Sequence, residues 1–237
     1  MKNYAIIDER MSVKCKNALI NEGFELIEVG SNPNLDIPIS SHPDIFIFKY
    51  NDILIYEHNM RHALGKHLFD FDKNRFKLIP GGTFSSEIKY PYDCAYNFAV
   101  CGMNLIGNIK YADKGIVDLI KLYKLKTIDT KQGYAKCNIF IVSNNAIITE
   151  DKGIAKACTS TGIDVLLLDT NSVKLNGYKN GFIGGASGKH NDKLYFCGCI
   201  EKHPEYERIN QFCKRHNTIP VSLSDEDLYD YGSIIVL

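Results

Sequence analysis

The sequence predicts an α/β fold made of about five repeated units, each with two strands, a helix and a third strand. Three observations support this interpretation. Short apolar segments with strand composition begin roughly every 40–50 residues, a spacing typical of propellers and arrays. Two such segments in each unit are separated by only a few turn residues, so they form a hairpin. A helix signal follows each hairpin, and a further apolar segment ends the unit.

Two other architectures fit less well. A doubly wound parallel sheet, the second choice, requires strands and helices to alternate one by one, and the repeated tight hairpins argue against that order. A WD40-type blade has four strands and no helix, whereas each unit here includes a helix signal. We therefore treat residues 1–237 as a single domain.

The clearest unit covers residues 137–168. Its turn residues, 143–145, are Ser-Asn-Asn, and asparagine tolerates the positive φ that tight hairpins require. Glu150 and Asp151 then begin a helix, because negative charge is favourable at a helix N-terminus. Gly162 ends this helix. The three strands of the unit are predicted at residues 137–142, 146–149 and 163–168.

Three more units repeat this order. Their hairpin strands are predicted at residues 44–48 with 53–56, 96–101 with 103–106, and 181–184 with 193–196. Their helices are predicted to begin near Glu57, Asp113 and Pro204, and closing strands are predicted at 127–128 and 219–222. Two irregular tracts, 31–42 and 71–87, are long enough to serve as lids or cover loops.

The fifth unit is divided between the two ends of the chain. Residues 233–237 are an apolar strand with nothing after it, and residues 4–7 are a strand with nothing before it. Pairing the two completes the missing hairpin. A helix over residues 9–22, ended by Gly23, and a strand over residues 24–29 complete the unit. Such a terminal pairing would close a ring without leaving a bare sheet edge.

The composition excludes some classes of function. Lysine and arginine total 28 residues, as do aspartate and glutamate, so the formal net charge is zero. Nucleic-acid-binding domains usually carry a basic excess, so we expect no nucleic-acid partner. The N-terminal residues lack the apolar core of a signal peptide, and no segment approaches the length of a membrane span. The eight cysteines are therefore expected to be reduced thiols in a cytoplasmic protein. Abundant lysine, asparagine and isoleucine with five arginines indicate an AT-rich bacterial genome.

Three stretches carry a resemblance to a known fold family: residues 90–97, 131–137 and 177–188. With the five-unit order, the chain resembles a group of uncharacterised bacterial proteins of the guanidine-modifying-enzyme, or pentein, fold. The resemblance implies an α/β propeller of five ββαβ units about a pseudo-fivefold axis. Arginine deiminases, dimethylarginine hydrolases, amidinotransferases and the non-enzymatic initiation factor 6 share that fold, so the fold alone implies no activity.

The resemblance also implies where functional residues lie, because in pentein proteins they cluster where the first strand of each unit meets the axis. Polar residues recur at these places here, which predicts a central polar pocket. The alternative is that the aspartates and asparagines only cap turns before strands. The candidate ligand-binding residues facing the axis are Asp44, Asp93, Asn97, Cys137, Asn138 and Asn180.

Pentein enzymes attack a guanidinium carbon with a cysteine thiolate near the C-terminus, assisted by a histidine and by carboxylates. This chain departs from that pattern, since no cysteine follows Cys213 and no histidine matches the expected position. We therefore expect a protein that binds a small polar ligand, or a partner, at the axis without the standard catalytic set. The alternative is a hydrolase or transferase acting on a guanidino or amide compound through a relocated cysteine, Cys137 or Cys94. Ser233 as a nucleophile lacks an identifiable base.

No cofactor or metal is expected. His58 and His62 would share a helix face at i, i+4, which makes at most a weak metal clip. The stretch 184–190, Gly-Gly-Ala-Ser-Gly-Lys-His, could cradle a phosphate through backbone N–H groups. It departs from the Walker A pattern, so a tight hairpin or a strand kink is the preferred interpretation.

Overall fold

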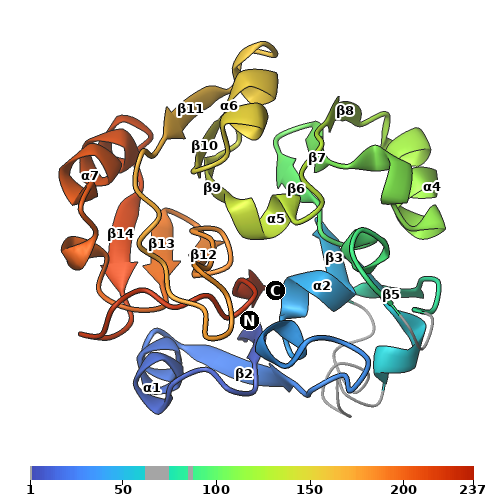
Figure 1. Ribbon diagram of the computed structural model, residues 1–237, viewed down its shortest axis with the longest axis horizontal. Helices are drawn as coiled ribbons and strands as arrows, with labels where there is room; N and C mark the ends of the chain where they lie inside the picture. Colours follow the sequence, from blue (N-terminus) through green and yellow to red (C-terminus); the bar gives the residue numbers. More distant parts are fainter. Residues whose placement is uncertain (1, 62–74, 85–87) are drawn as a thin grey trace.

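The computed structural model describes residues 2–61, 75–84 and 88–237. Within these residues the strands form five sheets of three strands each. In every sheet the first two strands form an antiparallel hairpin and the third runs parallel to the second. Figure 1 shows the five units arranged about a common centre, with the short helices α2 and α5 beside it. The predicted ββαβ order is therefore the observed strand order.

The bounds of the elements follow this repeat. The sheets, each in the order hairpin, hairpin, parallel strand, are β15 (Ile235–Val236), β1 (Asn3–Asp8) and β2 (Phe24–Val29); β3 (Ile47–Tyr50), β4 (Ile53–Tyr56) and β5 (Lys77–Pro80); β6 (Ala99–Cys101), β7 (Asn104–Gly107) and β8 (Lys126–Asp129); β9 (Ile139–Ser143), β10 (Ala146–Thr149) and β11 (Asp164–Leu167); and β12 (Ser187–His190), β13 (Lys193–Phe196) and β14 (Ile219–Ser222). The longer helices between hairpin and third strand are α1 (Val13–Asn21), α4 (Lys114–Tyr123), α6 (Lys152–Thr159) and α7 (Tyr206–Arg215).

The helix ends have the local causes expected from the sequence. The Asp151 carboxylate accepts the N–H of Ile154 at 2.8 Å, and α6 begins at the next residue after this cap. Gly162 follows the helix at a φ of +86°, where a side chain would be strained. Ser12 caps α1 by accepting the N–H of Cys15, and Gly23 follows that helix at +91°.

The two ends of the chain pair as predicted. β15 runs antiparallel to β1, with Ala5 opposite Val236 and Ile6 opposite Ile235, and β2 completes the sheet parallel to β1. The described strands form five separate sheets and no sheet closes on itself. The predicted closure therefore consists of the β1–β15 pairing, and not of one continuous closed sheet.

Several first strands begin later than predicted. Residues 44–46 belong to a helical turn, α2 (Pro43–Phe46), and residues 137–138 to another, α5 (Ala135–Asn138). Each strand, β3 or β9, starts immediately after its turn. The polar residues Asp44, Cys137 and Asn138 therefore belong to helical turns near the centre of the molecule and not to the strands. In the third unit, β6 begins only at Ala99.

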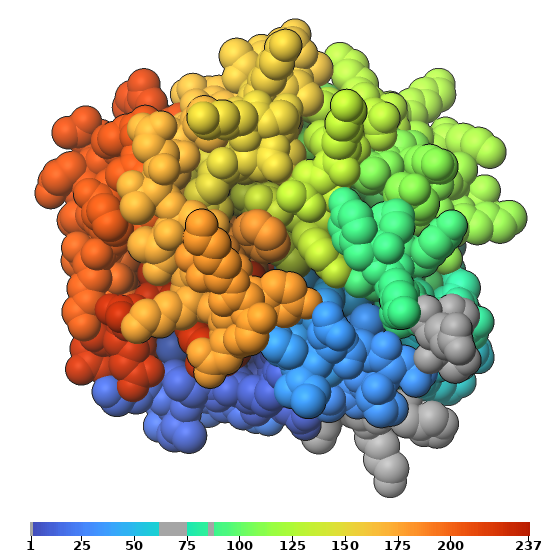
Figure 2. Space-filling model, in the orientation of Figure 1, coloured from blue at the N-terminus to red at the C-terminus, as the bar shows by residue number. Residues whose placement is uncertain are grey.

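The hairpin predicted from residues 181–184 is wrong, because β12 is the strand that pairs with β13. Gly184 instead packs against α5, where a Cβ would lie 2.4 Å from the carbonyl oxygens of Lys136 and Ile139. Gly184 thus permits a close approach of two backbones, whereas Gly185 makes room for the side chain of Asp230. Figure 2 shows this connection between β11 and β12, in orange, near the centre of the face in view.

The second unit holds two further differences. The tract predicted as irregular at residues 71–87 contains β5, which pairs with β4. The helix predicted from near Glu57 begins as a 3-10 helix over His58–Arg61. His62 and the remainder of that predicted helix lie outside the described residues, and the suggested pairing of His58 with His62 therefore stays a prediction.

Apolar side chains fill the space between each helix and its sheet and between neighbouring units. Ile154 and Cys158 of α6 are fully buried in one cluster with Ile147 of β10. Phe140 and Phe196, from adjacent units, meet edge to face with ring centroids 4.9 Å apart. All eight cysteines are free, and all except Cys199 are buried. This packing fixes the first strands around the centre.

Candidate functional site

The first strands of the five units surround a cavity of about 760 Å³. Residues of β3, β6, β9, β12 and β15 all contribute to its wall, so the cavity lies where the units meet. Asn51, Asn144 and Asn191, from three hairpin turns, line it as well. The cavity therefore extends toward the hairpin ends of the first strands.

The charged residues in the cavity wall are three lysines. Lys49 comes from β3, Lys136 from α5 and Lys189 from β12, so the amines come from three different units. No aspartate or glutamate among the described residues lines the cavity. Burial lowers the pKa of each lysine, and the positive charge of Arg75 lowers that of Lys49 further. The cavity wall is thus basic and incompletely hydrated.

A buried polar cluster lies behind Lys136. The Lys136 ammonium donates to Ser233 Oγ at 3.0 Å, and the Ser233 hydroxyl donates to Asp44 Oδ2 at 2.7 Å. The Cys137 thiol donates to the same Asp44 oxygen at 3.1 Å. Asp44 and Ser233 are fully buried. Burial raises the pKa of Asp44, while Lys136, Ser233 and Cys137 act in the opposite direction. The cluster holds the Lys136 side chain in one position at the cavity wall.

Asn97 joins this cluster to the backbone. Its side-chain oxygen accepts the N–H groups of Lys136 at 2.7 Å and Cys137 at 3.3 Å. Its amide nitrogen donates to the Asp44 carbonyl and to Cys137 Sγ, both at 3.1 Å. Asn97 is fully buried, and these four bonds use both ends of its amide. It therefore fixes α2 and α5 relative to each other.

A second carboxylate, Asp230, lies near the cluster. It accepts the N–H groups of Phe182 and Gly232, both at 2.9 Å, while burial and the nearby Asp44 raise its pKa to about 7. His42 Nδ1 lies 3.8 Å from Asp230, and burial lowers the pKa of this histidine to about 3. The imidazole is therefore neutral at physiological pH, and its contact with Asp230 is not an ion pair.

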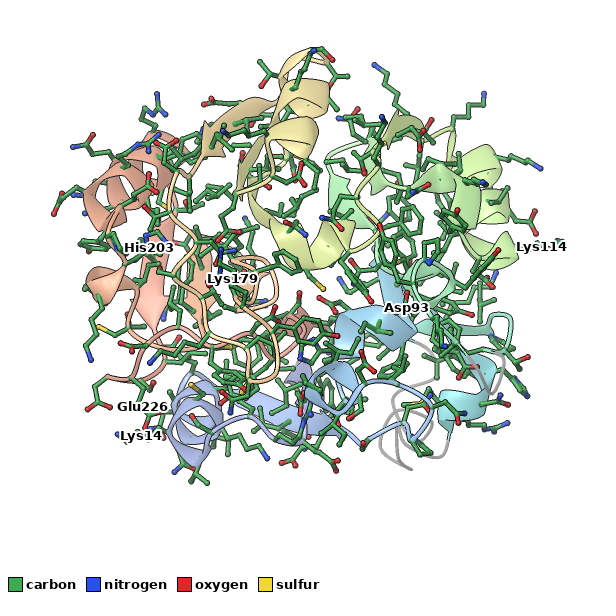
Figure 3. All side chains as sticks on the ribbon, in the orientation of Figure 1. Lys14, Asp93, Lys114, Lys179, His203 and Glu226 are labelled. Atoms are coloured by element: carbon green, nitrogen blue, oxygen red, sulfur yellow. The ribbon has the colours of Figure 1, made fainter. Side chains whose placement is uncertain are left out.

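The structure brings together three of the six predicted ligand-binding residues: Asp44, Asn97 and Cys137. Asp93 forms a neighbouring group, accepting the Tyr134 hydroxyl at 2.6 Å and the Cys94 thiol at 3.4 Å. Figure 3 shows Asp93 well inside the molecule, whereas Lys14 and Glu226, which form a 3.3 Å ion pair, lie at the rim.

The remaining two candidates, Asn138 and Asn180, do not belong to the cluster. Asn138 donates to the Tyr134 carbonyl at 3.0 Å and so stabilises the α5 turn. Asn180 is half-buried in the β11–β12 connection and makes no side-chain hydrogen bond to the cluster. None of the six candidates lines the 760 Å³ cavity.

Sequence reasoning missed the cavity lysines. Lys49 is a single lysine between two aromatic residues of a buried strand, which is a detectable signal because lysine seldom occupies such positions. Lys189 falls in the turn of the predicted hairpin, because the first strand of that hairpin is predicted at residues 181–184 and not at 187–190. The base near Ser233 was also missed, because Lys136 and Ser233 are 97 residues apart in the sequence.

The two cysteines considered as nucleophiles are thiol donors. Burial, followed by the negative charge of Asp44, raises the pKa of Cys137 well above its usual value. Burial and Asp93 also raise the pKa of Cys94. Ser233 has an amine beside it but is fully buried and does not line the cavity. The thiolate that a cysteine nucleophile needs is therefore disfavoured at both positions.

No group of three or more His, Cys, Asp or Glu side chains among the described residues is placed to hold a metal ion. No helix in the described part of the chain has the length and apolar character needed to cross a membrane.

Comparison with known proteins places the chain in a family and a fold. Residues 6–235 match a family of unknown function, DUF6873, and the chain belongs to that family. No curated protein matches the sequence.

The solved structures that resemble the chain are enzymes of the guanidine-modifying, or pentein, fold. Agmatine deiminase of C. jejuni is 13% identical, with a TM-score of 0.55 over 93% of this chain and 87% of that one. DDAH from Pseudomonas aeruginosa, a variant complexed with citrulline, is 9% identical, with a TM-score of 0.56 over 94% and 91%. The amidinotransferase SxtG from Microseira wollei is 11% identical, with a TM-score of 0.51 over 93% and 88%. At such identities the likeness shows the fold alone.

Proposed function

We propose that this DUF6873 member binds a small polar ligand in the cavity between the first strands of its five units and does not turn that ligand over. The observation that carries the proposal is the cavity itself. Its volume, about 760 Å³, lies within the range of small-molecule sites. Its wall combines apolar strand residues with a few fixed polar groups, Lys136 above all.

The absence of turnover rests on the chemistry of the candidate nucleophiles. No cysteine follows Cys213, where the pentein enzymes carry theirs. Cys137 and Cys94 have raised pKa values, and their protonated thiols donate hydrogen bonds to the carboxylates of Asp44 and Asp93. His42, the histidine beside the cluster, is buried and neutral, and its nearest charged neighbours are aspartates. A thiol whose pKa is raised is a poor nucleophile, because little thiolate forms at neutral pH.

The enzymatic alternative is weaker on the same grounds. The solved neighbours include an agmatine deiminase and a DDAH complexed with citrulline, so the fold accommodates guanidino chemistry in those proteins. A guanidinium ligand is normally gripped by carboxylates. Here Asp44 and Asp230 are buried behind the cavity. Asp44 Oδ2 and Asp230 accept hydrogen bonds from internal donors, whereas Asp44 Oδ1 has no partner among the described residues.

Native mass spectrometry of protein purified without added ligand tests the proposal. Val100 of β6 lines the cavity, so Val100→Trp would occupy part of it; Leu122→Trp, on the exposed face of α4, is the matched control. We expect a bound mass in the wild type and in the control that Val100→Trp loses. A ligand-free wild type, together with no small molecule that stabilises wild type more than Val100→Trp, would overturn the proposal.

A further inference from the structure

We infer that the ligand of the central cavity is a small anion carrying at least two carboxylate or phosphate groups, held by Lys49, Lys136 and Lys189. This inference rests on the proposed function, because it names the chemical class of the ligand that the cavity would hold. It differs from what the neighbours' names suggest, since agmatine is a cation.

The charge distribution of the cavity wall is the first argument. Three lysines from three units line one cavity, and no described carboxylate lines it. A guanidinium placed there would meet like charges without a compensating partner. An anion with two or more acidic groups could contact several of the amines at once, and charge-assisted hydrogen bonds of this kind are the strong ones.

In the part of the chain that the structure describes, Lys49 and Lys189 lack the ion pairs that other lysines form. Lys193 pairs with Glu22 and Lys174 with Asp227, each at 2.6 Å. Among the described residues, neither Lys49 nor Lys189 lies within ion-pair distance of a carboxylate. Lys189 donates instead to the Asn191 carbonyl at 2.8 Å. Both lysines are half-buried, and charges taken partly out of water are stabilised by an opposite charge, so two such amines without an ion pair favour an anionic ligand.

The buried cluster fixes the orientation of the Lys136 side chain. Its ammonium is held by Ser233, which is itself held by Asp44, and its backbone N–H is held by Asn97. One charged donor is therefore positioned before a ligand arrives, which reduces the ordering cost of binding. The hairpin asparagines Asn51, Asn144 and Asn191 add neutral polar groups toward the other end of the cavity.

Isothermal titration calorimetry at low ionic strength and neutral pH tests the inference, with citrate and pyrophosphate as the anionic probes and agmatine as the cationic probe. The variants are Lys49→Met, Lys189→Met and their combination; Lys131→Met, at an exposed position, is the matched control. Neither substituted lysine belongs to the buried cluster, so folding should be retained. Citrate and pyrophosphate separate a carboxylate ligand from a phosphate ligand.

We expect at least one anion to bind once per chain, and each cavity substitution to weaken that binding about tenfold or more, as for a lost charged hydrogen bond. Lys131→Met should bind as the wild type does, and agmatine should give no binding heat. Anion binding that persists in the double variant would overturn the inference. Agmatine binding that Val100→Trp abolishes would also overturn it while leaving the proposed function intact. If no probe binds and no ligand co-purifies, both fail together.

Discussion

Charged residues have different surroundings at the two ends of the first strands. Where the strands start, Asp44, Ser233 and Cys137 are buried, and both Ser233 and Cys137 donate to Asp44. Toward the hairpin ends, Lys49 and Lys189 line an open cavity, and neither forms an ion pair with a described carboxylate. Asp52 and Asp192 act on their charges only from a greater distance. Lys136 belongs to both regions, because its ammonium donates to Ser233 in the cluster while the residue also lines the cavity.

This difference separates structural polarity from ligand-directed polarity. A buried polar group that finds its partners inside the protein contributes to one defined packing of the chain. A charged group that remains without a partner in a cavity carries a cost that a ligand can remove. The polar residues that the sequence singles out, such as Asp44 and Asn97, bond mainly inside the protein. Lys49 and Lys189 instead face a cavity without a described ion-pair partner.

The largest effect is expected from removing the carboxylate of the cluster. Asp44→Ala would leave Ser233 and Cys137 without their acceptor and Lys136 without its nearby opposite charge. Breaking a buried charged network on one side costs about 3–5 kcal/mol, so we expect a loss of that size in the free energy of unfolding, measured with urea. Asp118→Ala, which removes an exposed ion pair with Lys114, is the control. A loss for Asp44→Ala no larger than that of the control would show that the cluster is not structural.

A pH dependence should come from Asp230. Burial raises its pKa to about 7, whereas an unfolded aspartate titrates near about 3.9. Between these values the folded chain holds a proton that the unfolded chain has lost, so this contribution to stability is complete below the unfolded pKa and is lost as pH rises through about 7. Relative to Asp230→Asn, wild-type stability should fall by about 3 kcal/mol between about pH 5 and pH 8.

His42 acts in the opposite direction but is present in both proteins, so its effect cancels in this comparison. Burial lowers its pKa to about 3, which removes stability as pH falls below the unfolded value. Parallel stability curves for the wild type and Asp230→Asn would contradict the raised pKa of Asp230.

A smaller change in the free energy of unfolding, opposite in sign to that of Asp44→Ala, is expected from a substitution in the cavity. Lys49→Met removes an amine that burial and Arg75 make unfavourable in its charged form. Without a ligand we expect this variant to be more stable than wild type by about 1 kcal/mol in urea unfolding. Citrate or pyrophosphate should then stabilise it less than wild type. Destabilisation of the empty variant would mean that Lys49 already has a partner in the protein.

The smallest change concerns thiol reactivity and tests the enzymatic alternative. In the folded protein at neutral pH, iodoacetamide should modify Cys199 first, because it is the one cysteine that is not buried. Cys137 and Cys94 should react more slowly, since burial raises the pKa of both thiols. Peptide mass spectrometry gives the order of labelling. Early modification of Cys137 or Cys94 would favour the hydrolase or transferase reading.

The sequence predicted the repeat well because local signals determine it. Asp151 and Gly162 mark the two ends of α6, and hairpin turns rich in asparagine and glycine mark the strand pairs. The pairing of the two terminal strands also followed, since each strand lacked a partner elsewhere. These features depend on residues close in sequence or on simple counting of strands.

The site was less predictable because it depends on contacts between distant segments. The turns α2 and α5 interrupt apolar stretches that look like strands, and they are stabilised by Asn97, which lies far from both in the sequence. The start of β12 was misplaced because the apolar pattern does not reveal that Gly184 must pack against α5. Lys49, Lys136 and Lys189 share a cavity only after the five units are arranged about one centre.

The most direct test of the central claim is a high-resolution crystal structure of the protein with citrate or pyrophosphate, whichever binds more tightly in solution. We expect density for one anion in the cavity, within hydrogen-bond distance of the amino groups of Lys136 and at least one of Lys49 and Lys189. The Asp44 cluster should keep its hydrogen bonds unchanged. A cavity that contains only water, with the anion bound elsewhere or not at all, would contradict the account.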